Sequence, residues 1–90
     1  MIQPGFIVVF KQSAVKELQA LPKKVQAKIL EAVHLLSLNP HTELLQIKKL
    51  KGAAALYRVR LQAYRVIYTI ERSVVTITII KIGHRREVYR

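Results

Sequence analysis

The sequence predicts an α+β domain: a strand, an antiparallel helical hairpin on one face of a mainly antiparallel sheet, and a C-terminal three-strand meander. Three observations predict it. The last third of the chain holds three runs rich in Val, Ile, Thr and Tyr, at 56–61, 64–70 and 74–82, separated by links of two or three residues. Two patterns with helical spacing precede these runs, and a short apolar segment precedes both. All 90 residues are expected to form this one domain.

A short strand is predicted at 6–10, where five apolar residues follow a Pro-Gly pair. It is expected to join the same sheet as the meander. A first helix comes next, with Ser13 as a candidate N-cap. This helix should end near Leu21, because Pro22 disfavours helical geometry in the residue before it.

A second helix is predicted over 22–37, with Pro22 in its first turn. Apolar residues recur there every three or four positions, which is the spacing of one helix face. Since the break between the helices is short, they should run antiparallel. Asn39 and Pro40 end the second helix, and 47–51 is expected to be a short strand or an extended edge segment.

The meander should have two chemically different faces. Arg58 and Arg60 alternate with the apolar residues of 56–61, and successive side chains of a strand face opposite sides of a sheet. Arg65 alternates with apolar residues in the same way within 64–70. One face is therefore predicted to pack under the helices and the other to be open and cationic.

The charge of the chain is large and unevenly distributed. The formal net charge is +11, and residues 48–90 hold eleven Lys or Arg against two Glu, whereas residues 1–47 hold five Lys and three Glu. A positive field of this size attracts polyanions, so nucleic acid is the first partner expected and an acidic protein or anionic membrane the next. A basic face that is merely solvated is the alternative.

Several other classes of protein are disfavoured. There is no cysteine, so disulfide and thiolate chemistry are excluded. No apolar run approaches the roughly 18 residues of a membrane span, and the N-terminus lacks a signal-peptide pattern, so a cytoplasmic protein is expected. His34 and His41 stand seven residues apart without Cys or Asp nearby, which makes a metal site improbable. No metal or other cofactor is expected.

Four motifs carry a family resemblance: KLKG at 49–52, LYRVR at 56–60, YRVIY at 64–68 and IGHRREVY at 82–89. In this order and spacing, behind a helical hairpin, they resemble the RelE/ParE superfamily of bacterial and archaeal toxins, and within it the RelE branch. The resemblance implies the toxin of a toxin–antitoxin pair that enters the ribosomal A site and cleaves mRNA there. Its implied partners are mRNA, the ribosome and a cognate antitoxin with an acidic segment.

Metal-free RNA cleavage uses the ribose 2′-hydroxyl as the nucleophile on the adjacent phosphate. Guanidinium groups suit stabilisation of the phosphorane, because they stay charged and fork onto phosphate oxygens. The resemblance assigns this task first to Arg65, since members of the family carry a functional arginine in this motif, and then to Arg85 or Arg86. The alternative for Arg65 is an exposed strand arginine that pairs with Glu71 or Glu87.

His84 and Tyr89 are the candidates for proton transfer. An ordinary imidazole titrates at about 6.5 and an ordinary phenol at about 10, and a phenol can also stack on a base. Some members of the family have a histidine near this position and others rely on the late tyrosine, so both remain candidates. Both are expected on the open face beside the arginines.

The general base is less well defined. Some RelE-type toxins carry lysines where this chain has Arg58 and Arg60, and arginine hardly deprotonates. Others carry a glutamate where this chain has Lys48. The remaining options are one of the lysines, His84, or no dedicated base, with orientation by the ribosome. The residues expected mainly to bind the RNA backbone are Lys48, Lys49, Lys51, Arg58, Arg60 and Arg86.

Two alternatives remain open at this point. A ParE-like toxin would share the scaffold but inhibit DNA gyrase through protein contacts. A non-catalytic or attenuated RNA-binding module would share the charge but not the chemistry.

Overall fold

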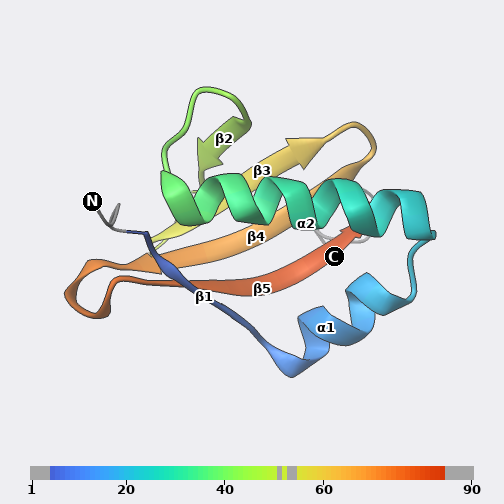
Figure 1. Ribbon diagram of the computed structural model, residues 1–90, viewed down its shortest axis with the longest axis horizontal. Helices are drawn as coiled ribbons and strands as arrows, with labels where there is room; N and C mark the ends of the chain where they lie inside the picture. Colours follow the sequence, from blue (N-terminus) through green and yellow to red (C-terminus); the bar gives the residue numbers. More distant parts are fainter. Residues whose placement is uncertain (1–4, 51, 53–54, 85–90) are drawn as a thin grey trace.

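The computed structural model describes residues 5–50, 52 and 55–84. In Figure 1, one long helix lies across the sheet, and a shorter helix lies beside the strand that comes last in the chain. In chain order the elements are β1 (Ile7–Phe10), α1 (Gln12–Gln19), α2 (Lys23–Leu38), β2 (Gln46–Lys49), β3 (Leu56–Leu61), β4 (Tyr64–Glu71), the short 3-10 helix η1 (Arg72–Val74) and β5 (Thr76–His84).

The strands form one five-stranded sheet in the order β1-β5-β4-β3-β2. The pair of β1 and β5 is parallel and all other pairs are antiparallel, so the predicted mainly antiparallel sheet is confirmed. β3 has the predicted bounds, while β5 begins and ends two residues later than predicted. The predicted edge segment is present as β2, which begins one residue and ends two residues earlier than expected.

The helix starts differ from the predictions. α1 begins at Gln12 with Lys11 as its N-cap, so the prediction of Ser13 as the cap was wrong. The N–H of Lys11 still donates to the carbonyl of Ile79 at 2.9 Å, so the helix begins directly after the last hydrogen bond of β1. Pro22 is the N-cap of α2, one residue outside the helix, and its carbonyl accepts from the N–H groups of Val25 and Gln26.

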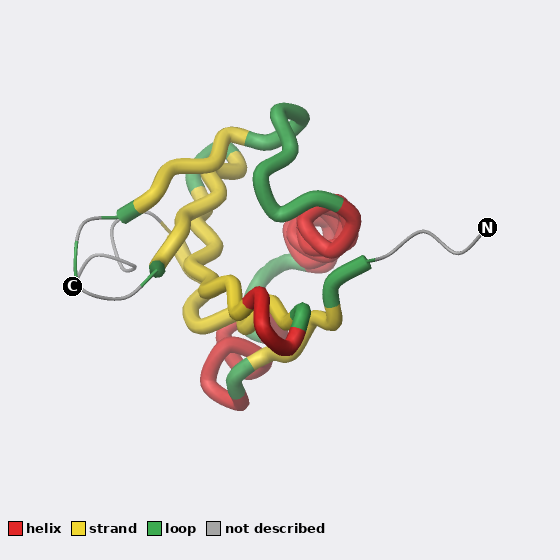
Figure 2. The backbone as a smooth tube through the Cα atoms, turned by 90° about the vertical axis from the view of Figure 1, so that its left-hand side faces the viewer, coloured by secondary structure: helices red, strands yellow, loops and turns green. Residues whose placement is uncertain are grey.

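Both helices and one face of the sheet share a single core. Figure 2 shows α2 on one side of the central strands. We call this side of the sheet the helix-side face and the other the open face. The buried residues of the core are Ala14 and Leu18 of α1, Ile29, Val33 and Leu36 of α2, and Val59, Val66, Tyr68, Ile77, Ile79 and Ile82 of the sheet.

Tyr68 lies at the centre of the helix-side face, with 0% of its surface exposed. Its hydroxyl donates to the carbonyl of Pro40 at 3.1 Å, and its ring stacks on that of Tyr57 at a centroid distance of 5.6 Å. Burial, together with the neighbouring Tyr57, raises the pKa of the Tyr68 phenol well above its ordinary value. The neutral phenol is therefore a structural group of the core.

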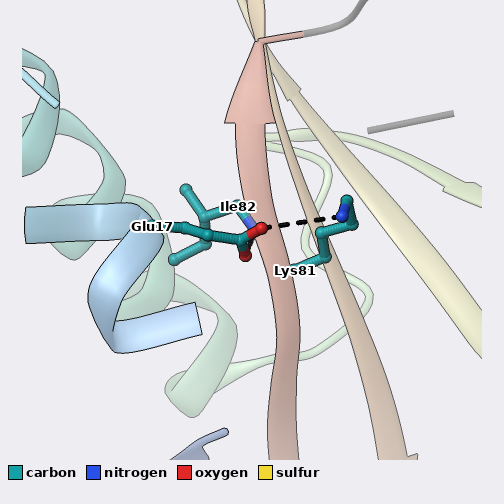
Figure 3. Close-up of polar contacts among 3 residues, drawn as sticks. All are labelled: Glu17, Lys81 and Ile82. Carbon is teal, nitrogen blue, oxygen red and sulfur yellow. Dashed lines mark hydrogen bonds and ion pairs between the residues drawn. The ribbon is translucent and has the colours of Figure 1, made fainter. Parts of the chain in front are cut away.

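A carboxylate from α1 binds β5 near the C-terminal end of that strand. β1 pairs with β5 only from Thr76 to Ile79, which leaves the later residues of that edge without a strand partner. The Oε1 atom of Glu17 accepts the N–H of Ile82 at 3.0 Å, and its Oε2 atom lies 3.6 Å from the Nζ atom of Lys81 (Figure 3). α1 thus replaces the missing strand at the edge where β5 approaches its end. Neither described helix is long and apolar enough to cross a membrane.

Candidate functional site

The open face gathers cations from four neighbouring strands. Val59 and Val66 are buried in the core, so their chain neighbours point to the opposite, open face. The pairing register sorts the open-face residues into two adjacent rows across the sheet. One row contains Lys48, Arg58, Ile67 and Lys81, and the other contains Gln46, Arg60, Arg65 and Gly83.

Like charges therefore face each other between strands. Lys48 is opposite Arg58, and Arg60 is opposite Arg65. Directly opposed like charges destabilise a sheet. Within the described residues, the ion pair that forms is between Glu17 and Lys81, and Lys48, Arg60 and Arg65 have no carboxylate partner. The open face is thus a site of concentrated positive charge that an anion would neutralise.

Arg65 is the most buried of these cations, with only 7% of its surface exposed. Its Nη1 atom donates to the carbonyls of Tyr64 at 3.3 Å and Gln62 at 3.4 Å, which are long hydrogen bonds. Its Nε atom is buried and has no hydrogen-bond partner in the described part of the chain. The alternative of an exposed strand arginine is therefore wrong.

The local backbone fixes where this guanidinium lies. The β3–β4 link is two residues long, as predicted, and Gln62 has a φ of +57°, so its backbone occupies the left-handed region. The turn presents the two carbonyls that hold the Nη1 atom. On the other side, the register partner of Arg65 is Gly83, which has no side chain to occupy the open face. Arg65 is thus held by its own turn and faces a residue without a side chain.

His84 lies on the helix-side face. It pairs with Tyr64 in the register, one position beyond the pair of Arg65 and Gly83, and its ring contacts that of Tyr64 edge-on at 5.8 Å. Tyr64 lines a groove of about 410 Å³ between α2 and the β3–β4 hairpin. The expectation that His84 shares the open face with Arg65 was wrong. A catalytic role for the imidazole stays a prediction.

Lys49 is also separated from the open-face cations. It is opposite Tyr57, whose ring packs on the helix-side face, whereas its neighbour Lys48 is opposite Arg58. The other predicted site residues, Lys51, Arg85, Arg86 and Tyr89, lie outside the described residues. The site that the structure brings together therefore consists of Lys48, Arg58, Arg60 and Arg65.

A family model described as the ParE toxin of the type II toxin-antitoxin system parDE matches residues 8–89. The chain belongs to the RelE/ParE superfamily. It is 35% identical over 86 residues to a RelE1 toxin of Methanocaldococcus jannaschii, and the match covers 94% of this chain and 96% of that protein. The resemblance seen in the four sequence motifs is confirmed, and the chain is a toxin of a toxin–antitoxin system.

Solved RelE structures share the fold of this toxin. The RelE of an archaeal RelE–RelB complex from Pyrococcus horikoshii OT3 superposes with a TM-score of 0.80 at 35% identity, covering 91% of this chain and 97% of that one. The isolated Escherichia coli RelE toxin superposes with a TM-score of 0.76 at 26% identity, covering 93% and 90% of the two chains. The arrangement of two helices on a five-stranded mixed sheet is thus that of RelE toxins.

Three guanidinium groups on one sheet face suit the binding of a charged phosphodiester, because each can donate more than one N–H to its oxygens. A developing negative charge on a phosphorane would be stabilised by the same groups. In the part of the chain that the structure describes, no cluster of three or more His, Asp or Glu side chains could hold a metal ion.

Proposed function

We propose that this RelE-like toxin is an endoribonuclease, an mRNA interferase that acts in the cytoplasm on mRNA in the ribosomal A site. The observation that carries the proposal is the buried Arg65, which has an unpartnered Nε donor and lies among the cations of the open face. A buried donor without a partner is costly unless a ligand uses it. A phosphate of the messenger would be such a ligand.

The proposed reaction needs no group other than the RNA and the protein. The ribose 2′-oxygen attacks the adjacent phosphorus and loses its proton, the bond from phosphorus to the 5′-oxygen breaks, and that oxygen takes up a proton. The products are a 2′,3′-cyclic phosphate and a 5′-hydroxyl. Arg65 is proposed to stabilise the phosphorane together with Arg85, while Arg58 and Arg60 hold the neighbouring phosphates.

The proton donor is better assigned to Tyr89 than to His84. The imidazole of His84 packs against Tyr64 on the helix-side face, whereas Arg65 points to the open face. An acid must lie within hydrogen-bond reach of the group that it protonates. Among the described residues Lys48 is the candidate for the base, because Arg58 and Arg60 hardly deprotonate. Lys51 and Arg86 are proposed to contact the RNA backbone.

The proposed protein partner is a cognate antitoxin with an acidic segment. The net charge of +11 would attract such a segment and draw it over the same cations that bind RNA. Among the related proteins, the Pyrococcus horikoshii RelE was solved with RelB. An antitoxin seated on the open face would block RNA and so restrain the toxin.

The test is a cleavage assay on ribosomes programmed with a defined messenger. The proposal predicts cuts within the A-site codon, reduced by Arg65→Ala and by Tyr89→Phe, with antitoxin binding retained. The matched control is Lys24→Ala, a removal of charge from the exposed side of α2. If neither the wild type nor the control cuts the messenger, the nuclease proposal is wrong.

A second candidate function is supported by the description of the matching family, which is that of ParE. A ParE-like toxin would inhibit DNA gyrase. A supercoiling assay with the same purified protein separates the two functions. Inhibition of supercoiling without messenger cleavage would favour gyrase, and neither activity would favour a non-catalytic RNA-binding module.

A further inference from the structure

A second group of aromatic and cationic side chains gathers around the loop that follows α2, next to the helix-side face of the sheet. The ring of His41 contacts Tyr57 edge-on at a centroid distance of 5.5 Å. The Nη2 atom of Arg72, from η1, lies 2.6 Å from the Nε2 atom of His41. Beside them is a groove of about 310 Å³, lined by His41, Glu43, Lys49 and Tyr57 among others. Residues of the loop after α2, of β2 and of β3 thus line one groove, and Arg72 of η1 flanks it through its contact with His41.

The loop that carries His41 is firmly held. The hydroxyl of Tyr68 binds the carbonyl of Pro40, and the backbone N–H of His41 donates to the Oδ1 atom of Asn39 at 3.0 Å. The hydroxyl of the next residue, Thr42, accepts the N–H of Leu44 at 3.2 Å. The groove is therefore bordered by a fixed loop and by the ring of Tyr57, which stacks on the buried Tyr68, so its shape exists before any ligand arrives.

One cation lies in the groove and a second lies beside it. A guanidinium can only donate, so the contact of Arg72 with the Nε2 atom requires that His41 is neutral there and accepts. Arg72 remains charged, and Lys49 faces Tyr57 across the β2–β3 pair. Glu43 also borders the groove, but neither Arg72 nor Lys49 forms an ion pair within the described residues. Lys49 in the groove, Arg72 beside it and the rings of His41 and Tyr57 can thus meet a ligand.

The edge strand β2 connects this groove to the open face. Lys48 and Lys49 are consecutive, so their side chains point to opposite faces of the sheet. Lys48 is opposite Arg58 in the open-face row, and Lys49 is opposite Tyr57 at the groove. Among the described strands β2 is at the edge of the sheet, so a path from one lysine to the other passes around that edge. Positive charge therefore continues from the open face to the groove.

We propose that this groove binds a nucleotide of the same single-stranded RNA that the open face holds. Lys49 and Arg72 contact its phosphates, and the rings of His41 and Tyr57 contact its base. The proposal rests on the proposed function for the class of ligand. Cations interleaved with aromatic rings favour RNA over an acidic peptide, because every base has a π-face that can pack on a ring.

The experiment measures the affinity of the full chain for a 2′-O-methylated RNA of about twelve nucleotides as a function of salt. The methyl groups block attack by the 2′-oxygen, so binding is measured without cleavage. The variants are Arg72→Gln, Lys49→Gln and His41→Ala. The matched control is Lys24→Gln, which removes a charge near the other end of α2, roughly 20 Å along the helix from the loop of His41.

Each charge variant should bind about fivefold more weakly at 0.1 M salt, and its log–log salt slope should fall by about 0.7, the value for one phosphate contact with a single strand. His41→Ala should weaken binding about fivefold or more and leave the salt slope unchanged, because stacking releases no counterions. Lys24→Gln should change neither quantity.

The proposal would be overturned if the RNA affinity and its salt slope were the same for Arg72→Gln and Lys49→Gln as for the control Lys24→Gln. Weaker binding of an acidic antitoxin peptide with unchanged RNA binding would also overturn it and would reassign the groove to the antitoxin. The binding measurement does not depend on catalysis. If the toxin binds the RNA as described but never cuts a messenger, the proposal for the groove stands and the nuclease proposal is wrong.

Discussion

On the helix-side face, Val59, Val66 and Tyr68 are buried among apolar neighbours from both helices. On the open face, their chain neighbours Arg58 and Arg65 belong to rows in which like charges oppose each other. The first arrangement stabilises the fold, whereas the second costs stability. This difference supports the proposal that the open face binds RNA. Substitutions on the helix-side face should therefore lower stability, and those on the open face should lower activity.

The largest effect is expected from Tyr68→Ala. Truncating this fully buried ring removes its stacking on Tyr57 and the hydrogen bond to the Pro40 carbonyl, and leaves a cavity. The free energy of unfolding should fall by about 3–5 kcal/mol. Urea denaturation followed by circular dichroism measures it. A loss below about 1 kcal/mol would mean that the helix-side face tolerates cavities and that the contrast between the faces is weaker than described.

Arg65→Ala should affect function and spare the fold. Removal of one preorganised donor to a charged transition state typically lowers the rate by about 10²–10³-fold, and messenger cleavage should fall by that factor. Arg65→Lys keeps the charge but loses the guanidinium fork, so it should not restore the wild-type rate. Single-turnover cleavage on programmed ribosomes gives the rates, and the thermal midpoint checks the fold. Wild-type cleavage by Arg65→Ala would remove this residue from the mechanism.

Glu17→Ala tests the contact between α1 and the edge of β5. The substitution leaves the N–H of Ile82 without its acceptor, which should cost about 1–2 kcal/mol of stability. Glu17→Gln keeps an acceptor oxygen, so it should restore most of the loss. Hydrogen exchange of the Ile82 amide reports the contact directly. Equal exchange rates in the wild type and in Glu17→Ala would show that another group protects this amide.

The stability of the fold should decrease above pH 10. Burial raises the pKa of Tyr68 in the folded chain, so the unfolded chain releases this proton first, and each pH unit above about 10 favours unfolding by up to about 1.4 kcal/mol. Below that pH the contribution is complete and constant. Tyr68→Phe has no phenol to ionise at this position. The extra stability of the wild type over this variant should therefore become smaller between about pH 9 and 11. A constant difference would contradict the assignment.

Gln62→Gly should give the smallest effect, a gain of about 0.5 kcal/mol, because a positive φ strains a residue with a Cβ atom. Ala63→Gly, at the other position of the same turn, has no positive φ to relieve and should lose stability by a similar amount. Thermal unfolding compares the two variants. A gain from both substitutions would indicate that the turn responds to glycine in general and not to the strain at Gln62.

Much of the sheet could be predicted because its pattern is local. The alternation within 56–61 gave the bounds of β3, and the two cationic rows follow from it once the register is known. The face of His84 was missed because the predicted strand ended at Ile82, before the alternation reached the histidine. The register shifts near Tyr68, at the consecutive Ile79 and Ile80 of β5. Because of this shift, Ile82 and His84 lie on the helix-side face.

Other features depend on contacts that no local pattern encodes. The start of α1 is set by a hydrogen bond from Lys11 to Ile79, far along the chain. His41 looked like an isolated loop histidine because its partner Arg72 lies 31 residues away. The motifs could therefore name the arginine, but only the fold shows which side chains share its face.

The most direct test of RNA cleavage at the open face uses a programmed ribosome whose A-site codon carries a single 2′-deoxy nucleotide. If the ribose 2′-hydroxyl is the nucleophile and Arg65 stabilises the phosphorane, the bond that follows the deoxy nucleotide should stay intact, and the toxin should still bind the ribosome. The unmodified codon should yield a 2′,3′-cyclic phosphate. Cleavage after the deoxy nucleotide at the normal rate would contradict this mechanism.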